Sequence, residues 1–188
     1  MISVAKLEAG VAVWVVFSAA AMSQSGKPAI GAPCQSSQLS ASIDNKESDQ
    51  IDGGVGNHAI TIAISNISPS RCTVNGVPGL TLLDTAKRRL QIPVCQNCQG
   101  YLFHTQPPGK VLLDPGAAAY VVIGYNINDG AGPCSQPATL SLPPPGDSRP
   151  LQASFAGFSR ICGKVNITPF LAKPPVDGFL PDPGESKK

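Results

Sequence analysis

The chain has 188 residues with 14 basic and 12 acidic side chains, a formal net charge of +2. Its 19 glycines and 19 prolines favour short strands and turns over helices. The tightest basic group is Lys87 to Arg89, which we interpret as a solvated turn. A nearly neutral chain without a larger basic patch excludes the electrostatic basis of nucleic-acid binding, so we expect no nucleic-acid partner.

The first 23 residues have the pattern of an export signal. A positive charge at Lys6 precedes a 13-residue apolar run from Gly10 to Met22, and Ala21-Met22-Ser23 offers a cleavage site. As a helix this run would rise about 20 Å, too short for a hydrocarbon core of about 30 Å. We therefore expect a signal peptide over 1–23 that is cleaved, a secreted or periplasmic protein, and no stable membrane span afterwards. An uncleaved anchor is the alternative.

After a lead-in over 24–33, alternating apolar residues predict a series of short strands separated by turn residues. The clearest is Ile60, Ile62 and Ile64, with small or polar residues between them. A corner at Gly76-Val77-Pro78-Gly79 bends another strand. The predicted strands cover 39–43, 60–64, 72–83, 90–94, 111–113, 119–125, 140–142, 151–155 and 162–167.

Seven to nine short strands without an amphipathic helix predict an all-β fold. We expect an antiparallel immunoglobulin-like β-sandwich over 34–172, with a closed barrel or jelly roll as the alternative. Residues 173–188 contain four prolines and no apolar period, so we expect a flexible tail there.

Several short motifs follow one another in a characteristic order over about 34–170. They are Cys34, Cys72-Thr73-Val74-x-Gly76-x-Pro78-Gly79, Leu113-x-Pro115-Gly116, Cys134, Leu140-x-Leu142-Pro143-Pro144 and Cys162-Gly163. This pattern resembles a bacterial family of exported immunoglobulin-like domains of unknown function, common in secreted proteins and lipoproteins. The resemblance implies the fold, export and two disulfides, but no activity. The chain departs from the family by lacking a lipidation cysteine and by adding Cys95 and Cys98.

All six cysteines follow the signal, and an even number in an exported chain indicates disulfides. Six cysteines allow fifteen pairings. The positions of the cysteines relative to the predicted strands agree with the resemblance. We predict the pairs Cys34–Cys72 and Cys134–Cys162, each contributing roughly 3.5–4 kcal/mol in the chain-entropy description. A third, small ring joins Cys95 and Cys98.

The loop from Cys95 to Gly109 is the segment where chemistry is most worth considering. Its C-x-x-C spacing fits a redox pair or half of a metal site, and His104 follows six residues after Cys98. However, a reactive thiol of this kind sits at a helix start, and structural zinc needs four ligands. The sequence offers neither, so we interpret the pair as a surface disulfide and expect no metal and no cofactor.

The same loop carries an apolar stretch that we identify as a candidate binding loop: Tyr101, Leu102, Phe103 and His104. Apolar loop tips of sandwich domains are common sites of partner contact. The alternative is a loop that folds back over the core.

The sequence carries no nucleophile elbow, phosphate-binding glycine loop or EF-hand pattern. We therefore expect no catalytic residue and no enzyme activity. The function we expect is that of an exported, non-catalytic module, binding or structural, at the cell envelope or outside the cell. Its partner, a protein or another envelope component, stays open. The alternative is a metal- or redox-handling envelope protein that uses Cys95, Cys98 and His104.

Overall fold

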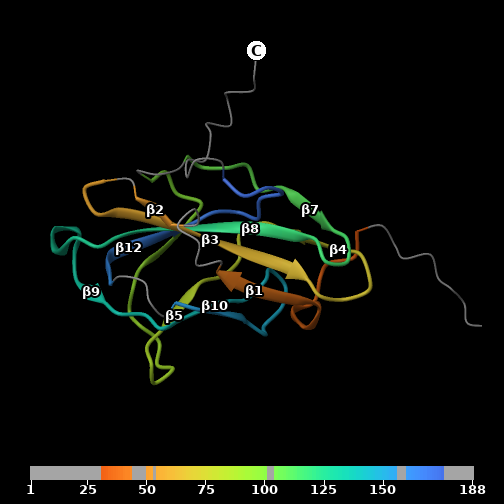
Figure 1. Ribbon diagram of the computed structural model, residues 1–188, viewed down its shortest axis with the longest axis horizontal. Coiled ribbons are helices and arrows are strands. Elements are labelled where there is room, and N and C mark those ends of the chain that lie inside the picture. The colour runs from red at the N-terminus through yellow and green to blue at the C-terminus, as the bar shows by residue number, and fades with distance from the viewer. Residues whose placement is uncertain (1–30, 44–49, 53, 101–103, 156–159, 176–188) are drawn as a thin grey trace, which may run out of the picture.

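The computed structural model describes residues 31–43, 50–52, 54–100, 104–155 and 160–175 (Figure 1). The predicted signal peptide, most of the lead-in and most of the predicted tail lie outside the described residues. Strands dominate the described part, with two short 3-10 helices. The elements are η1 (Ser36–Gln38), β1 (Leu39–Ile43), β2 (Gln50–Asp52), β3 (Asn57–Asn66), β4 (Cys72–Asn75), β5 (Thr81–Leu83), β6 (Val94–Gln96), β7 (Lys110–Leu113), β8 (Ala118–Asn126), η3 (Asp129–Ala131), β9 (Cys134–Ser135), β10 (Thr139–Leu142), β11 (Leu151–Ser154) and β12 (Ile161–Ile167).

The larger sheet is built on the long antiparallel pair β3 and β8, which run side by side through the middle of the molecule (Figure 1). Its order is β1-β3-β8-β12-β6, and β2 also pairs with β3 while β9 pairs with β12. Only β6 runs parallel to its neighbour, β12. Alternation along β3 places Ile60, Ile62 and Ile64 on one face, where all three are buried.

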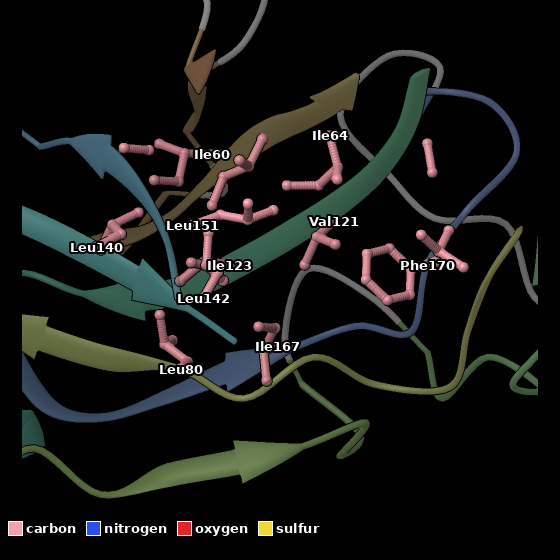
Figure 2. Close-up of a cluster of buried hydrophobic side chains, with 14 of the residues drawn as sticks. Ile60, Ile64, Leu80, Val121, Ile123, Leu140, Leu142, Leu151, Ile167 and Phe170 are labelled. Carbon is pink, nitrogen blue, oxygen red and sulfur yellow. The ribbon is translucent and has the colours of Figure 1, made fainter. Parts of the chain in front are cut away.

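A smaller sheet of order β11-β10-β5 supplies the second layer, and β4 pairs with β7 separately. The core fills the space between the layers, where Ile60 and Ile123 of the larger sheet approach Leu140 and Leu142 of the smaller one (Figure 2). Burying each such side chain contributes about 1.5–3 kcal/mol, which is the main source of stability for two packed sheets. The chain is therefore an all-β sandwich.

The predicted all-β, mainly antiparallel fold is confirmed, and two details differ from the prediction. The described residues form twelve strands rather than seven to nine, because segments as short as two or three residues, such as β2 and β9, add to the sheet edges. The predicted strand 90–94 does not form. Leu90 and Ile92 still pack against the core, but Pro93 has no N–H to donate to a ladder, so pairing begins only at Val94.

The predicted corner at Gly76–Gly79 changes the sheet to which the chain belongs. Before it, β4 pairs with β7, and after it β5 pairs with β10. Gly76 adopts a φ of 79°, and Gly79 donates its N–H to the carbonyl of Pro143 at 3.0 Å. A side chain at Gly79 would meet the ring of Pro143 at 2.7 Å, so the close approach of the chain requires glycine here.

A polar cluster ties the start of the domain to the turn between β10 and β11. The Ser36 amide donates to Asp147 Oδ2 at 2.8 Å, and the Ser36 hydroxyl donates to the Arg149 carbonyl at 2.6 Å. The Arg149 amide donates to Asp147 Oδ1 at 2.9 Å. These hydrogen bonds, first that from Arg149 and then those from Ser36, lower the pKa of Asp147 from 3.8 to about 2.

This lowered pKa predicts a pH-dependent part of the stability. A carboxyl whose folded pKa lies below its unfolded value stabilises the fold above about pH 4, and this contribution is lost as the pH falls through about 2. The free energy of unfolding of the wild type should therefore fall more steeply from pH 4 to pH 2 than that of Asp147→Asn. Urea unfolding at pH 4, 3 and 2 measures this difference, and parallel profiles for the two proteins would contradict the assignment.

Candidate functional site

Three disulfides join the pairs expected from the sequence. Cys34 bonds to Cys72, Cys134 to Cys162, and Cys95 to Cys98, with Cα–Cα distances of 4.9, 3.9 and 5.8 Å. The first two span 38 and 28 positions of the sequence and therefore constrain the unfolded chain strongly. Three disulfides indicate an oxidising, extracytoplasmic environment. Within the described residues, no helix is long and apolar enough to cross a membrane.

The loop that starts at the Cys95–Cys98 disulfide is held in place by hydrogen bonds. Asn97, between the two cysteines, adopts a φ of 53° and donates its backbone N–H to the Ile167 carbonyl at 2.7 Å. Its side-chain amide donates to the Gln106 carbonyl at 2.7 Å and accepts from the Gln106 amide at 2.9 Å. His104 Nδ1 lies 3.0 Å from Gln99 Nε2. The other residues of the candidate binding loop, Tyr101, Leu102 and Phe103, lie outside the described residues.

One group in the described part of the chain has the spacing of metal ligands, and it is not the one suggested by the sequence. It consists of Asp129, Cys134 and Cys162, whose ligand atoms lie within 4.8 Å of one another. Both sulfurs belong to the same disulfide and cannot act as thiolate ligands. Asp129 instead pairs with Arg160 at 3.0 Å. The group therefore does not constitute a metal site in the oxidised protein.

The strongest candidate site is a cavity of about 540 Å³ on the face of the larger sheet that points away from the core. We call it the outer hollow. It lies where β8 ends and β12 begins, at the end of the molecule that holds β9 (Figure 1). Its polar lining side chains come from four segments: Asn57, Gln99, Asn126, Lys164 and Asn166.

Strand alternation and register bring these side chains together. Val165 and Ile167 point into the core, so Lys164 and Asn166 point to the opposite face. Asn57 and Asn126 are direct partners across β3 and β8. Asn166 lies opposite Gly124, which carries no side chain and leaves open space in the floor of the hollow.

An irregularity in β12 shapes one wall of the hollow. The pairing of β12 with β8 shifts between Cys162 and Asn166, and within this bulge Gly163 has a φ of 70°. The Gly163 amide donates to the Pro133 carbonyl at 3.0 Å. This bond holds the turn that contains η3 against the strand, so Ala131 lines the hollow. Such bulges commonly redirect side chains beside binding sites.

Polar side chains of the hollow are partly pre-organised. Asn126 Nδ2 donates to Asn57 Oδ1 at 3.1 Å, and Asn126 Oδ1 accepts from the Asn128 amide at 2.6 Å. Asn166 Oδ1 is buried and has no hydrogen-bond partner among the described residues. A buried amide oxygen without a partner costs free energy, so its presence on a residue that lines the cavity requires an explanation.

The charge of the hollow has one sign. Lys164 is exposed and forms no ion pair within the described part of the chain, and no described lining residue is acidic. Tyr125 also borders the hollow, but its ring belongs to the core, 5.8 Å from the His58 ring and 5.9 Å from the Phe155 ring. Burial raises the pKa of Tyr125 to about 12, so its hydroxyl keeps its proton. The described lining can thus offer hydrogen bonds and one positive charge.

Reasoning from the sequence did not identify these residues. The signal that could have found two of them is the alternation in β12, where Lys164 and Asn166 occupy the outward positions of an otherwise apolar strand. Asn57 and Asn126 are 69 positions apart and meet only through the register of β3 and β8. Gln99 lies in the Cys95 to Gly109 loop that the sequence singled out, but it was not among the candidate residues named there.

Comparison with known proteins identifies a family but no described relative. Residues 34–171 match the family model whose description is domain of unknown function (DUF4232). No curated protein and no solved structure matches the chain. Because the family match covers most of the 188 residues, from the first cysteine to just beyond β12, the chain belongs to the DUF4232 family of domains of unknown function.

Proposed function

We propose that the chain is an exported, non-catalytic binding module of the cell envelope or the extracellular space, and that the outer hollow is its binding site. The export pattern over residues 1–23 and the three disulfides support the location. The scaffold in this proposal is an immunoglobulin-like sandwich, which the two packed sheets support.

The observation that carries the proposal is the convergence of polar side chains in one cavity. Its volume of about 540 Å³ lies within the usual range for small-molecule sites. Asn57, Asn126, Lys164 and Asn166 belong to β-strands rather than to loops, and strands position side chains more rigidly. The unpaired oxygen of Asn166 is explained if the site is selected for binding at some cost in stability.

The chemistry of the lining supports binding rather than catalysis. Asparagine and glutamine amides donate and accept hydrogen bonds but do not transfer protons near neutral pH. The pKa of Tyr125, raised to about 12 by burial, keeps this hydroxyl from acting as a base. The proposal therefore assigns these groups to holding a ligand in place.

Asn166→Leu tests this proposal because it separates binding from stability. Leucine has a similar shape and removes a buried amide oxygen without a partner, so the melting temperature should equal or exceed that of the wild type. A ligand that binds the folded protein raises its melting temperature. We would screen neutral sugars, sugar acids, amino acids and short-chain fatty acids at millimolar concentration. At least one class should stabilise the wild type, and Asn166→Leu should lose that stabilisation.

The matched control is Asn75→Leu, since Asn75 is an exposed asparagine of β4 outside the hollow. This variant should keep the ligand-induced rise in melting temperature. The proposal fails if no class stabilises the wild type, or if Asn166→Leu is stabilised as much as the wild type is.

The second candidate function is metal or redox handling by Cys95, Cys98 and His104. The observation in its favour is a disulfide between two half-buried cysteines only three positions apart, one in β6 and one in the loop that follows it. Protein made through an oxidising export route should contain no free thiol and no bound metal under our proposal. Non-reducing peptide mapping should return the pairs Cys34–Cys72, Cys95–Cys98 and Cys134–Cys162. Two reactive thiols or stoichiometric zinc would instead favour the second candidate.

A further inference from the structure

We propose that the ligand of the outer hollow is a small carboxylate that also carries several hydroxyl groups, as a sugar acid does. In this assignment Lys164 binds the carboxylate, and the amides of Asn166 and Gln99 bind hydroxyl groups. This inference rests on the proposed binding function and adds the chemical class of the ligand.

The positive charge of the hollow selects an anion. Lys164 is the only charged residue among the described lining residues, and no described acidic side chain forms an ion pair with it. The nearest acidic group on the adjoining turn, Asp129, already pairs with Arg160 at 3.0 Å. An ammonium group on a strand, beside half-buried asparagine side chains, is therefore available to an incoming carboxylate, and such a charge-assisted bond is stronger than a neutral one.

One ammonium group suits a singly charged ligand. Phosphate sites usually combine arginine forks or several backbone N–H groups at a helix start. The described lining contains no arginine, and the only helix that contributes to it is η3, which has three residues. A carboxylate, with one negative charge, matches the single ammonium better than a phosphate does.

The amides select hydroxyl groups. Each side-chain amide has both a donor and an acceptor, as a hydroxyl group does, so the two can exchange a pair of hydrogen bonds. Asn57 and Asn126 already bond to each other and form a fixed polar wall. Asn166 Oδ1 has no partner among the described residues and can accept from a ligand hydroxyl once the amide turns toward the cavity.

The floor and walls favour a ligand that is polar on several sides. Gly124 in the floor and Gly100 in the wall carry no side chain, so a ligand can approach the backbone closely. Tyr125, the one aromatic residue among the described lining residues, has its ring in the core. Binding by hydrogen bonds and charge is therefore expected to outweigh binding by aromatic stacking.

Isothermal titration calorimetry with three probes tests the assignment. Galacturonate carries the carboxylate and the hydroxyl groups, galactose lacks the carboxylate, and propionate lacks the hydroxyl groups. Wild-type protein should bind galacturonate at least about tenfold more tightly than either of the other two, since each loses a set of hydrogen bonds. Raising the salt concentration should weaken galacturonate binding and leave galactose binding unchanged.

Variants of Lys164 and Asn166 test which residue binds the carboxylate and which binds the hydroxyl groups. Lys164→Ala should weaken galacturonate binding about tenfold or more, to the level of galactose, because the charged contact is lost. Lys173→Ala is the control: it removes the same charge from an exposed position outside the hollow and should bind as the wild type does. Asn166→Leu should weaken binding of both galacturonate and galactose.

The outcomes distinguish this inference from the proposed function. If galactose or propionate binds as tightly as galacturonate, or if Lys164→Ala binds like the wild type, the ligand class is wrong. If another class from the melting screen binds in a way that depends on Asn166, the binding function stands and only this inference falls. Comparing galacturonate with its linear trimer separates a free sugar acid from an acidic polysaccharide as the source, since tighter binding of the trimer points to the polysaccharide.

Discussion

Gly163→Ala should destabilise the domain by about 3 kcal/mol or more. Gly163 has a φ of 70°, where an L-residue costs about 1–2 kcal/mol. An added Cβ would also lie 2.2 Å from the carbonyl oxygen of Ala131, and relieving such a clash costs typically 1–3 kcal/mol. For a domain of this size the melting temperature should fall by roughly 6–12 °C. Thermal unfolding followed by circular dichroism measures the change.

Gly146→Ala is the matched control for Gly163→Ala. Gly146 also has a positive φ, 85°, but an added Cβ there would have no atom within 4 Å. The free energy of unfolding of Gly146→Ala should therefore fall only by the cost of the left-handed backbone conformation, about 1–2 kcal/mol. If the two variants lost equal free energies of unfolding, the close approach of the η3 turn to the β12 bulge would add no cost to a side chain at position 163. If Gly163→Ala still folds, we expect weaker ligand binding because the displaced turn lines the outer hollow.

Asn66→Ala should lower the free energy of unfolding by about 3–5 kcal/mol, a loss of the size produced by breaking a buried hydrogen-bond network. Asn66 is fully buried at the end of β3. Its Nδ2 donates to the carbonyls of Ser70 and Leu113 at 2.8 and 3.1 Å. Its Oδ1 accepts from the amide and the hydroxyl of Ser68 at 3.0 and 2.8 Å. Alanine would remove all four hydrogen bonds; the Ser70 carbonyl would keep the one from the Ser68 hydroxyl, and each group that stays buried without a partner costs about 1–3 kcal/mol.

Urea unfolding of Asn66→Ala and of Asn75→Ala gives the comparison. Asn75 is exposed at the end of β4, so its substitution should change the free energy of unfolding by no more than about 0.5 kcal/mol. Asn66→Asp should resemble Asn66→Ala, because a carboxylate cannot donate to the two carbonyls. A loss below about 1 kcal/mol for Asn66→Ala would contradict the role of this side chain as the organiser of the turn after β3.

The sequence predicted the fold best where periodicity is long and simple. The alternating isoleucines of 60–64 and the apolar run of 119–125 became the central strands β3 and β8. The segment 90–94 has the same alternation, yet no strand forms before Val94: the Leu90 N–H donates to the Leu82 carbonyl at 2.8 Å, and Pro93 has no N–H to continue a ladder. Alternation therefore predicts which side chains are buried more securely than it predicts which backbone groups pair.

The candidate site was harder to predict because it depends on register. Nothing near Asn57 in the sequence indicates that its partner is Asn126, or that Gly124 opens a space opposite Asn166. The sequence pointed instead to the loop after Cys95, where unusual spacing is visible without a structure. That loop contributes Gln99 and Gly100 to one wall, so the prediction located part of the site's surroundings but not its polar centre.

The central claim, that this domain binds a ligand in the outer hollow, is tested most directly by NMR of the side-chain amides. We would titrate ¹⁵N-labelled protein with galacturonate and then with the remaining classes of the melting screen. The account predicts shifts in the amide signals of Asn126 and Asn166, while those of Asn66 and Asn97, bonded elsewhere in the fold, stay unchanged. Unshifted signals of Asn126 and Asn166 with every class, or shifts centred on Asn66 or Asn97, would contradict it.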